Sequence, residues 1–385
     1  MPADPDLSTK GMRRAGPFYL HPYVALKDVG YDDNVRFETA QPQGDFTATA
    51  SPGVSALLLG GDRGGLVLSQ GFEYVAFQEN ADLNHWNSTS RVRGIFLLKR
   101  LGLSLEDRFS SLRGRPNNEI DQRLRQKDNA ATASLWLRRE GRLGMRSYVR
   151  QERIDYPSGD PGAAEAGGRL NRDEGTFSLA GELRILPKTT FVMEGVLQRV
   201  EFDDRGQGRD TRASSLLPGF RFDPSASVQG QLKVGVTSLE APDRPQSNVR
   251  TTTGEGSLST RLGSTARLKG TFSRSLVFSI STENLYYVST SWSSAYEQFF
   301  SHRLSAEIVY GRGLNHYPEE VMRIGPPPFQ DIRDDRLSDY QLSMRFRVSD
   351  RLAFTLRAQR LVRDSSDDSL DRQRDFYAVG SSYDF

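Results

Sequence analysis

The last segment of the chain, residues 375–385, alternates large side chains with small or polar ones at a period of two. The large side chains on one face include those of Tyr377, Val379, Tyr383 and Phe385. A period of two is typical of a β-strand, because successive side chains of a strand point to opposite faces. The segment therefore predicts a strand with one apolar face and an aromatic end. It fits an ordinary edge strand of a soluble sheet, and it fits the lipid-facing closing strand of a membrane barrel.

The overall composition excludes a helical membrane protein. Hydrophobic residues make up 36% of the 385 residues, and the mean hydropathy is -0.57. No segment approaches the roughly 18 consecutive apolar residues that a spanning helix needs. A barrel is still allowed, because only every second residue of its strands faces lipid. The absence of cysteine removes disulfides, thiolate metal sites and cysteine nucleophiles.

Alternating segments of the same kind recur along the chain, and there are about 18 of them, an even number as in bacterial barrels. The predicted strands cover residues 18–27, 45–59, 65–78, 86–98, 102–112, 129–138, 142–156, 175–185, 189–202, 211–222, 226–239, 249–262, 266–278, 284–296, 302–312, 336–348, 352–362 and 375–385. Most exceed the roughly 5–6 residues of soluble strands and are nearer to the roughly 9–11 of a tilted membrane strand.

Short and long connections alternate between these segments. Short ones, such as 349–351, follow one end of the strands, and long polar ones, such as 113–128, follow the other. The connection at 279–283 is the exception, because it is short where the pattern requires a long one. A soluble β-sandwich has no reason to alternate its connections in this way. The sequence therefore predicts an all-β fold, a single transmembrane antiparallel β-barrel at 17–385 with short periplasmic turns and long extracellular loops. Residues 1–16 are predicted to form a short periplasmic segment.

With the apolar faces turned to lipid, the opposite faces line a bore in which basic residues outnumber acidic ones by about two to one. The candidate pore-lining and substrate-binding residues are Arg91, Arg93, Arg146, Arg150, Arg184, Lys233, Arg267, Lys269, Arg345, Arg347 and Arg357. Arginine suits bidentate contacts with carboxylates and phosphates. Two interpretations stay open: these residues bind an anionic solute or polymer along the bore, or they brace a wide barrel through ion pairs.

Nothing in the sequence predicts catalysis. The four histidines lie at the ends of predicted strands or in loops, and no serine elbow or metal-ligand spacing accompanies them. We therefore predict that the protein is not an enzyme and that it needs no cofactor or metal. No nucleic acid is expected as a partner.

The opening strand and loop carry a recognisable pattern, GPFYLHPYVAL at residues 16–26 and GYDDNV at residues 30–35. This pattern resembles the outer-membrane β-barrel porin family encoded in exopolysaccharide gene clusters, whose members begin with a proline-containing strand and a Tyr-Asp-Asp-Asn loop. The resemblance implies export of a polysaccharide chain across the outer membrane, alongside a periplasmic polysaccharide-export protein. It carries over no catalytic residues. The alternative function is a general or anion-selective diffusion porin for small solutes.

The predicted location is the bacterial outer membrane, where lipid surrounds the barrel. The aromatic ending, with Tyr383 and Phe385 on one face, resembles the signal read by the bacterial barrel-assembly machinery, which is therefore an expected partner. Residues 1–8 lack the apolar core of a secretory signal, which an outer-membrane protein requires. Either the chain begins after the cleavage point, or translation starts upstream of Met1.

Overall fold

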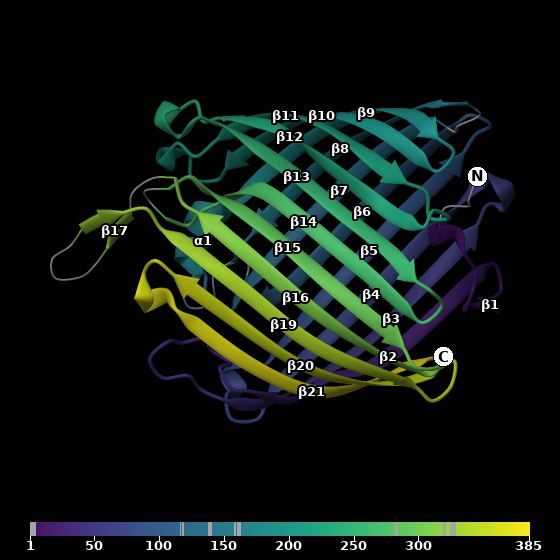
Figure 1. The fold of residues 1–385 in the computed structure, drawn as a ribbon, viewed down its shortest axis with the longest axis horizontal. Coiled ribbons are helices and arrows are strands. Elements are labelled where there is room, and N and C mark those ends of the chain that lie inside the picture. The colour runs from purple at the N-terminus through teal and green to yellow at the C-terminus, as the bar shows by residue number, and fades with distance from the viewer. Residues whose placement is uncertain are drawn as a thin grey trace.

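In the computed structural model the chain forms one closed antiparallel barrel of 18 strands (Figure 1). The structure describes residues 5–115, 117, 119–137, 141–157, 159, 163–281, 284–318, 321–323 and 329–385. Each barrel strand pairs with its neighbours along the chain, and the last strand, β21, pairs with the first, β2. This closure removes the sheet edges, so the strand backbones find hydrogen-bond partners within the wall. The predicted fold class and strand number are confirmed.

The barrel strands are 12 to 15 residues long. In chain order they are β2 (Phe18–Asp32), β3 (Asp45–Leu59), β4 (Gly64–Phe77), β5 (His85–Leu97), β6 (Leu101–Gly114), β7 (Leu124–Leu137), β8 (Leu143–Asp155), β9 (Arg172–Leu186), β10 (Thr189–Phe202), β11 (Thr211–Phe222), β12 (Val228–Glu240), β13 (Val249–Leu262), β14 (Ala266–Phe278), β15 (Tyr286–Phe299), β16 (Leu304–His316), β19 (Asp334–Arg347), β20 (Leu352–Ser365) and β21 (Arg372–Asp384).

The shorter elements are not part of the 18-strand wall. They are the strand β1 (Arg13–Ala15), the hairpin β17 (Val321–Arg323) and β18 (Phe329–Asp331), the helix α1 (Ala163–Leu170), and the 3-10 turns η1 (Pro5–Leu7), η2 (Gly61–Arg63), η3 (Ala81–Leu83), η4 (Arg205–Gln207), η5 (Pro245–Ser247) and η6 (Asp368–Leu370). β1 pairs with the start of β2. Among the residues that the structure describes, no helix is long and apolar enough to cross a membrane.

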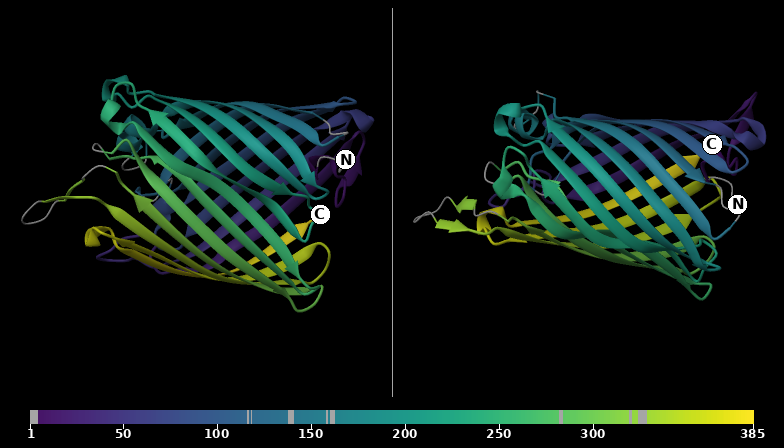
Figure 2. Two further views of the ribbon diagram at one scale, coloured as in Figure 1. Left: turned by 45° about the horizontal axis from the view of Figure 1, so that its top comes forward. Right: turned by 90° about the horizontal axis from the view of Figure 1, so that it is seen from above.

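The two ends of the barrel differ. Both chain termini and the short turns lie at one end, and α1, the β17–β18 hairpin and the long connections lie at the other (Figures 1 and 2). We call these the turn end and the loop end. In an outer-membrane barrel the short turns are periplasmic and the long loops extracellular, so the turn end faces the periplasm.

The alternation of the sequence sets the two faces of the wall. On β9, Phe177, Leu179 and Leu183 are exposed on the outside, whereas Ser178 and Glu182 are buried on the inside. Large apolar side chains are exposed on the other strands in the same way, for example Leu342, Met344 and Phe346 on β19. Exposed apolar side chains over the whole wall fit a lipid environment, in which only the outward residue of each pair must be apolar.

Several strands extend further toward the loop end than the sequence predicted. β2 continues to Asp32, although the turn formers from Asp28 onward predicted a loop; a register shift between Lys27 and Gly30 absorbs the irregularity. The strand can continue because Arg374 of β21 donates to both carboxylate oxygens of Asp32, at 2.8 and 2.6 Å.

Pro52 has no N–H to donate to a ladder, and the sequence therefore predicts a bulge at residues 51–53. β3 instead runs through Pro52 in register with β2, and its ladder with β4 has a gap between Ala50 and Gly53. Proline has no N–H to donate, so the ladder loses a bond without changing register. The end of the predicted strand 129–138 and part of its turn lie outside the described residues.

The wall opens between two strands at the loop end. The ladder of β13 and β14 runs only from the pair Gly254–Arg274 to the pair Leu262–Ala266, and the two strands diverge beyond it (Figure 1). The Arg274 side chain crosses the gap and donates from Nε to the Thr252 carbonyl oxygen at 2.9 Å. We call this gap the β13–β14 seam.

Beyond the seam, the loop ends of β14 and β15 lean into the bore. Phe278 meets the inward ring of Phe202, with the ring centroids 5.1 Å apart. An apolar cluster fills this mouth of the barrel; we call it the mouth cluster, and its buried members are Ile120, Leu124, Ile154, Tyr156, Ala166 and Leu170. A second cluster packs behind the seam and includes Leu239, Ala241, Leu285, Tyr286 and Val288. Both clusters therefore lie at the loop end.

We predict that the last aromatic residue is needed for efficient assembly. The Phe385 side chain is exposed on the outer face, its ring lies 4.9 Å from that of Tyr383, and its N–H donates to the Pro22 carbonyl oxygen at 3.1 Å. Phe385→Ala should reduce several-fold the amount of barrel that shows heat-modifiable migration on gels. Phe300→Ala is the control, because Phe300 is an exposed aromatic residue on a turn at the same end. Equal yields from the two variants would contradict the prediction.

Candidate functional site

Most of the predicted basic residues of the bore contact acidic residues. Those with an acidic partner within 4.0 Å are Arg91, Arg93, Arg146, Arg150, Lys233, Arg267 and Arg357. Glu182, for example, lies 2.9 Å from Arg146 and 2.6 Å from Arg221. These ion pairs favour the bracing interpretation at these positions. A role in solute binding stays a prediction.

The remaining predicted residues gather near the turn end of the bore. Arg184, Lys269, Arg345 and Arg347 have exposed side chains and no acidic partner within 4.0 Å in the described part of the chain. Arg345 and Arg347 end β19 just before the turn at 348–351. Each faces inward, because its strand neighbours Met344 and Phe346 are exposed on the outside. These cations are available to solutes at the periplasmic entrance.

The connection between β6 and β7, residues 115–123, folds across the bore instead of extending outward. On one side it contacts the connection between β14 and β15, and on another it contacts β20 and β21. β14 stands eight strands after β6 in an 18-strand wall, so these contacts reach nearly the opposite side. We call residues 115–123 the constriction loop; its described residues are 115, 117 and 119–123.

Glu119 fixes the constriction loop to the connection between β14 and β15. Its Oε1 accepts a hydrogen bond from the Ser279 hydroxyl at 2.6 Å, and its Oε2 accepts one from the Ile280 N–H at 2.9 Å. Burial raises the pKa of the Glu119 carboxyl, although these hydrogen bonds and the nearby Arg333 guanidinium favour its charged form. The next residue, Ile120, is buried in the mouth cluster.

Asp121 fixes the other side of the constriction loop. Arg363 of β20 donates from Nη1 and Nη2 to the two carboxylate oxygens at 3.0 and 2.9 Å, and Arg372 of β21 donates from Nη2 at 3.2 Å. Arg363 is only 2% exposed, so water screens this pair poorly. A bidentate arginine–carboxylate contact is strong and directional, and it holds the loop in one position.

Arg115 joins the constriction loop to the connection between β2 and β3. It donates from Nε to the Asp121 carbonyl oxygen at 2.8 Å and from Nη2 to the Val35 carbonyl oxygen at 3.2 Å. Its guanidinium also lies 4.2 Å from the ring centroid of Phe37. Burial, together with neighbouring arginines, lowers the pKa of Arg115 to about 9. The side chain therefore remains mostly charged at neutral pH.

A cavity of about 760 Å³ remains between the constriction loop and the barrel wall. Its wall side includes small or hydroxylated residues, namely Thr271, Ser289, Ser291, Ser293, Gly311 and Gly313, together with the carboxylate of Asp339. Arg115 and Asp121 of the loop and Arg363 of β20 supply further charges. Hydroxyl groups and charges of both signs suit a small polar solute, which can exchange its water for contacts with them. We call this cavity the passage.

The constriction loop was missed by sequence reasoning, which treated residues 113–128 as an ordinary external loop. A signal was present: Ile120 is an isolated apolar residue between two acids in a polar segment. The short connection at 279–283 was a second signal. Ser279, Asn284 and Leu285 are fully buried, so this connection is short because it is tucked into the mouth, where it receives Glu119.

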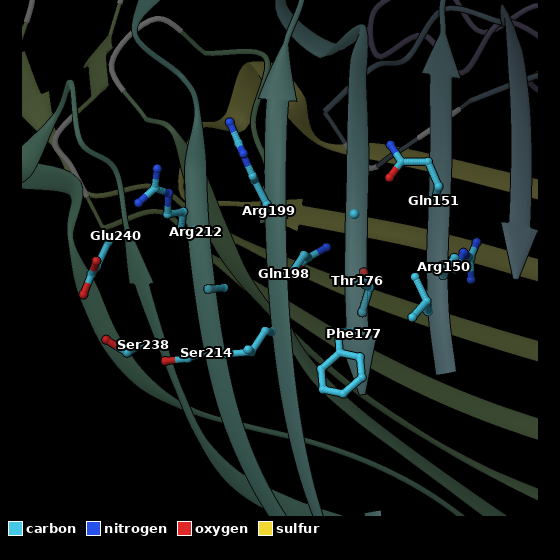
Figure 3. Close-up of a pocket in the computed structure, with 14 residues that line it drawn as sticks. Arg150, Gln151, Thr176, Phe177, Gln198, Arg199, Arg212, Ser214, Ser238 and Glu240 are labelled. Atoms are coloured by element: carbon cyan, nitrogen blue, oxygen red, sulfur yellow. The ribbon is translucent and has the colours of Figure 1, made fainter. Parts of the chain in front are cut away.

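A second cavity, of about 430 Å³, lies on the outer face of the wall over β8–β12 (Figure 3). Its apolar part includes Phe177 and Leu197, and Arg199 and Arg212 border it. These residues occupy the outward positions of their strands, so the cavity is not part of the bore. Within the described residues, no group of three or more His, Asp or Glu side chains is placed to hold a metal ion.

We predict that docking of the constriction loop depends on pH through Glu119. A carboxyl whose pKa is raised in the docked state favours that state when protonated, so docking should weaken as the pH rises through a value above the ordinary 4.5. Single-channel conductance in planar bilayers should therefore increase from acid to neutral pH. Glu119→Gln should reduce this increase, because its uncharged amide can accept from the Ile280 N–H through its oxygen and donate to the Ser279 hydroxyl oxygen through its nitrogen.

The control for this prediction is Asp243→Asn, which removes an exposed carboxylate from another connection at the loop end. That variant should retain the wild-type pH dependence. The same dependence in Glu119→Gln would contradict the prediction.

Comparisons with known proteins agree with the geometry. The chain is similar to OccK9 (OpdG) of Pseudomonas aeruginosa, with a TM-score of 0.51 and 12% identity over 95% of this chain and 98% of that one. It is also similar to OpdK of Pseudomonas aeruginosa in its structure with vanillate, with a TM-score of 0.50 and 11% identity over 95% and 98% of the two chains. At such identities the likeness concerns the fold alone. No protein with a curated description matches.

The chain also matches the model of a protein family. The model of the family described as Putative beta-barrel porin 2 matches residues 4–383, which is nearly the whole chain. Together with the closed barrel, this match also places the protein in the bacterial outer membrane. The chain therefore belongs to the Putative beta-barrel porin 2 family.

Proposed function

We propose that this porin is a passive channel for small polar solutes, with a preference for anions. The observation that carries the proposal is the constriction loop, which crosses the bore and leaves a passage of about 760 Å³ beside it. Binding sites for small molecules typically measure about 300–1,000 Å³, so a small solute fits this space. The loop is held on both sides by partly buried hydrogen bonds, and it therefore restricts the size of what can pass.

Charges at the turn end of the bore support the preference for anions. The passage at the loop end carries both signs, with Arg115 and Arg363 beside Asp121 and Asp339. Arg345 and Arg347 lie exposed at the turn end without acidic partners among the described residues. Rings of charged side chains set the ion preference of a pore, because they change the local concentration of each ion.

Export of a polysaccharide is the second candidate, and the resemblance of the opening strand and loop implies it. The hydroxylated wall of Ser289, Ser291 and Ser293 favours it, because hydroxyl groups can exchange hydrogen bonds with a sugar chain. The family description names no polysaccharide. OpdK, which shares the barrel fold, was solved with vanillate, a small carboxylate. The small-solute channel therefore has the better support.

Liposome swelling distinguishes the two candidates. Proteoliposomes of the purified porin should swell quickly in solutions of small carboxylates or monosaccharides and slowly in solutions of long oligosaccharides. Exclusion of the small solutes would contradict the proposed function. Loss of surface polysaccharide in cells that lack the protein, with unchanged uptake of small solutes, would favour export.

We predict that releasing the constriction loop widens the channel. Asp121→Ala removes the carboxylate that Arg363 and Arg372 hold, and the loss of charge-assisted hydrogen bonds worth about 1.5–3 kcal/mol should let the loop leave the bore. Single-channel conductance should rise by about twofold or more. Asp243→Ala should leave conductance unchanged, because Asp243 is exposed on another connection. A wild-type conductance in Asp121→Ala would show that the loop does not limit the flow.

We also predict that Arg345 and Arg347 set ion preference. Replacing both with glutamate should shift the reversal potential in a potassium chloride gradient from anion toward cation preference. The matched control replaces Arg63 and Arg351 with glutamate; both lie exposed on turns at the same end but outside the bore. Equal shifts in the two double variants would assign the effect to general surface charge.

A further inference from the structure

We propose that Arg91 and Arg93 form a binding site for a small carboxylate on the bore wall, and that Asp6 of the chain itself occupies this site. The proposal rests on the proposed function, since it identifies one solute-binding site along the same channel. It adds an occupant that competes with solute, namely the N-terminal segment around η1.

The Asp6 carboxylate lies between the two arginines. Its Oδ2 accepts a hydrogen bond from Arg91 Nη2 at 3.0 Å and a second one from Arg93 Nη1. Arg91 and Arg93 stand two apart on β5 and face inward, because Val92 between them is exposed on the outside. Two guanidinium groups that converge on one carboxylate oxygen are the arrangement expected of a carboxylate site.

Asp6 shares this site with Glu106, a carboxylate of the wall. Glu106 of β6 is shared by Arg91 at 2.8 Å, Arg93 at 3.6 Å and Arg108 at 3.1 Å. The described ion pairs of the cluster thus join three arginines to one glutamate and Asp6. Removal of Asp6 would take one negative charge from the site, which favours binding of another anion.

The wall also makes room for the segment that carries Asp6. Leu7 lies against Gly65 of β4, where an added Cβ would come within 2.9 Å of Leu7 Cδ2. Gly65 faces the bore, because side chains alternate along a strand and Leu68, three positions further along β4, is exposed on the outside. Among the described contacts, the Asp6 carboxylate and the Leu7 side chain thus hold the segment against the wall. A solute carboxylate at high concentration competes with Asp6 for the same two guanidinium groups.

Carboxylate block in planar bilayers tests this proposal. Wild type, Asp6→Asn and Asp62→Asn would be compared in potassium chloride with added potassium benzoate as the probe. Asn keeps the size of the side chain but loses the charge that Arg91 and Arg93 hold. The benzoate concentration that halves the current should be about tenfold lower in Asp6→Asn than in wild type, because the probe no longer competes with an internal carboxylate.

The control and a second variant give the result its meaning. Asp62 is an exposed acid on the η2 turn at the same end, so benzoate should block Asp62→Asn at the same concentration as wild type. Adding Arg93→Gln to Asp6→Asn should abolish the gain in benzoate affinity. Heat-modifiable migration would verify that each variant forms a barrel.

The possible failures are distinguishable. If Asp6→Asn conducts ions and benzoate blocks it as it blocks wild type, the inference is wrong and the proposed channel function stands. Equal effects of Asp6→Asn and Asp62→Asn would also overturn the inference, because they would assign the change to general charge. If folded wild-type and variant barrels conduct no ions or small solutes, the proposed function fails, and the inference fails with it.

Discussion

The requirement that every backbone N–H and C=O in the membrane find a partner determines this architecture. Hydrocarbon offers no hydrogen bonds, and each unsatisfied group costs several kcal/mol, so a sheet can span the membrane only when it closes on itself. Here the pairing of β2 with β21 achieves closure. Closure also separates the side chains into an outer set that meets lipid and an inner set that meets water and other charges. The ion pairs of the bore follow from this separation, because polar residues are concentrated inside.

A wall of 18 strands is too wide to select small solutes by its own side chains, so selection depends on what enters the bore. In this porin the constriction loop fills part of the mouth, and the N-terminal segment approaches the wall nearer the turn end. Both are held by carboxylates that contact arginines, at Asp121 and at Asp6. The arginines of the bore therefore hold segments of the protein inside it, in addition to forming ion pairs between strands of the wall.

The strand pattern could be read from the sequence because it is local. The alternation of Phe177, Ser178 and Leu179 defines two faces whatever lies elsewhere in the chain, and the alternation of connection lengths defines two ends. The contacts of the constriction loop could not be read in this way. Asp121 and Arg363 are 242 residues apart, and Glu119 and Ser279 are 160 apart. Only the closed barrel brings them together, so no local period encodes them.

The same limit explains why the bore residues were only partly interpreted. The alternation of side chains along each strand showed which arginines point inward. Whether such an arginine binds solute or braces the wall depends on which acid stands nearby on another strand. Lys233 contacts Glu194 across β11, and Arg221 contacts Glu182 across β10, and both contacts depend on the register of three strands. The lack of an acidic partner for Arg345 and Arg347 among the described residues likewise depends on how the wall folds.

The β13–β14 seam has a consequence for the stiffness of the channel. Most neighbouring strands are joined by hydrogen-bonded ladders, whereas at the seam the loop end of β14 has no ladder with β13, and apolar contacts around Leu239 and Leu285 pack there. Apolar attraction weakens on cooling, and the hydrogen-bonded ladder does not share that temperature dependence. The connection that follows β14 carries Ser279 and Ile280, to which Glu119 is bound. The mouth of the barrel should therefore soften in the cold while the rest of the wall keeps its shape.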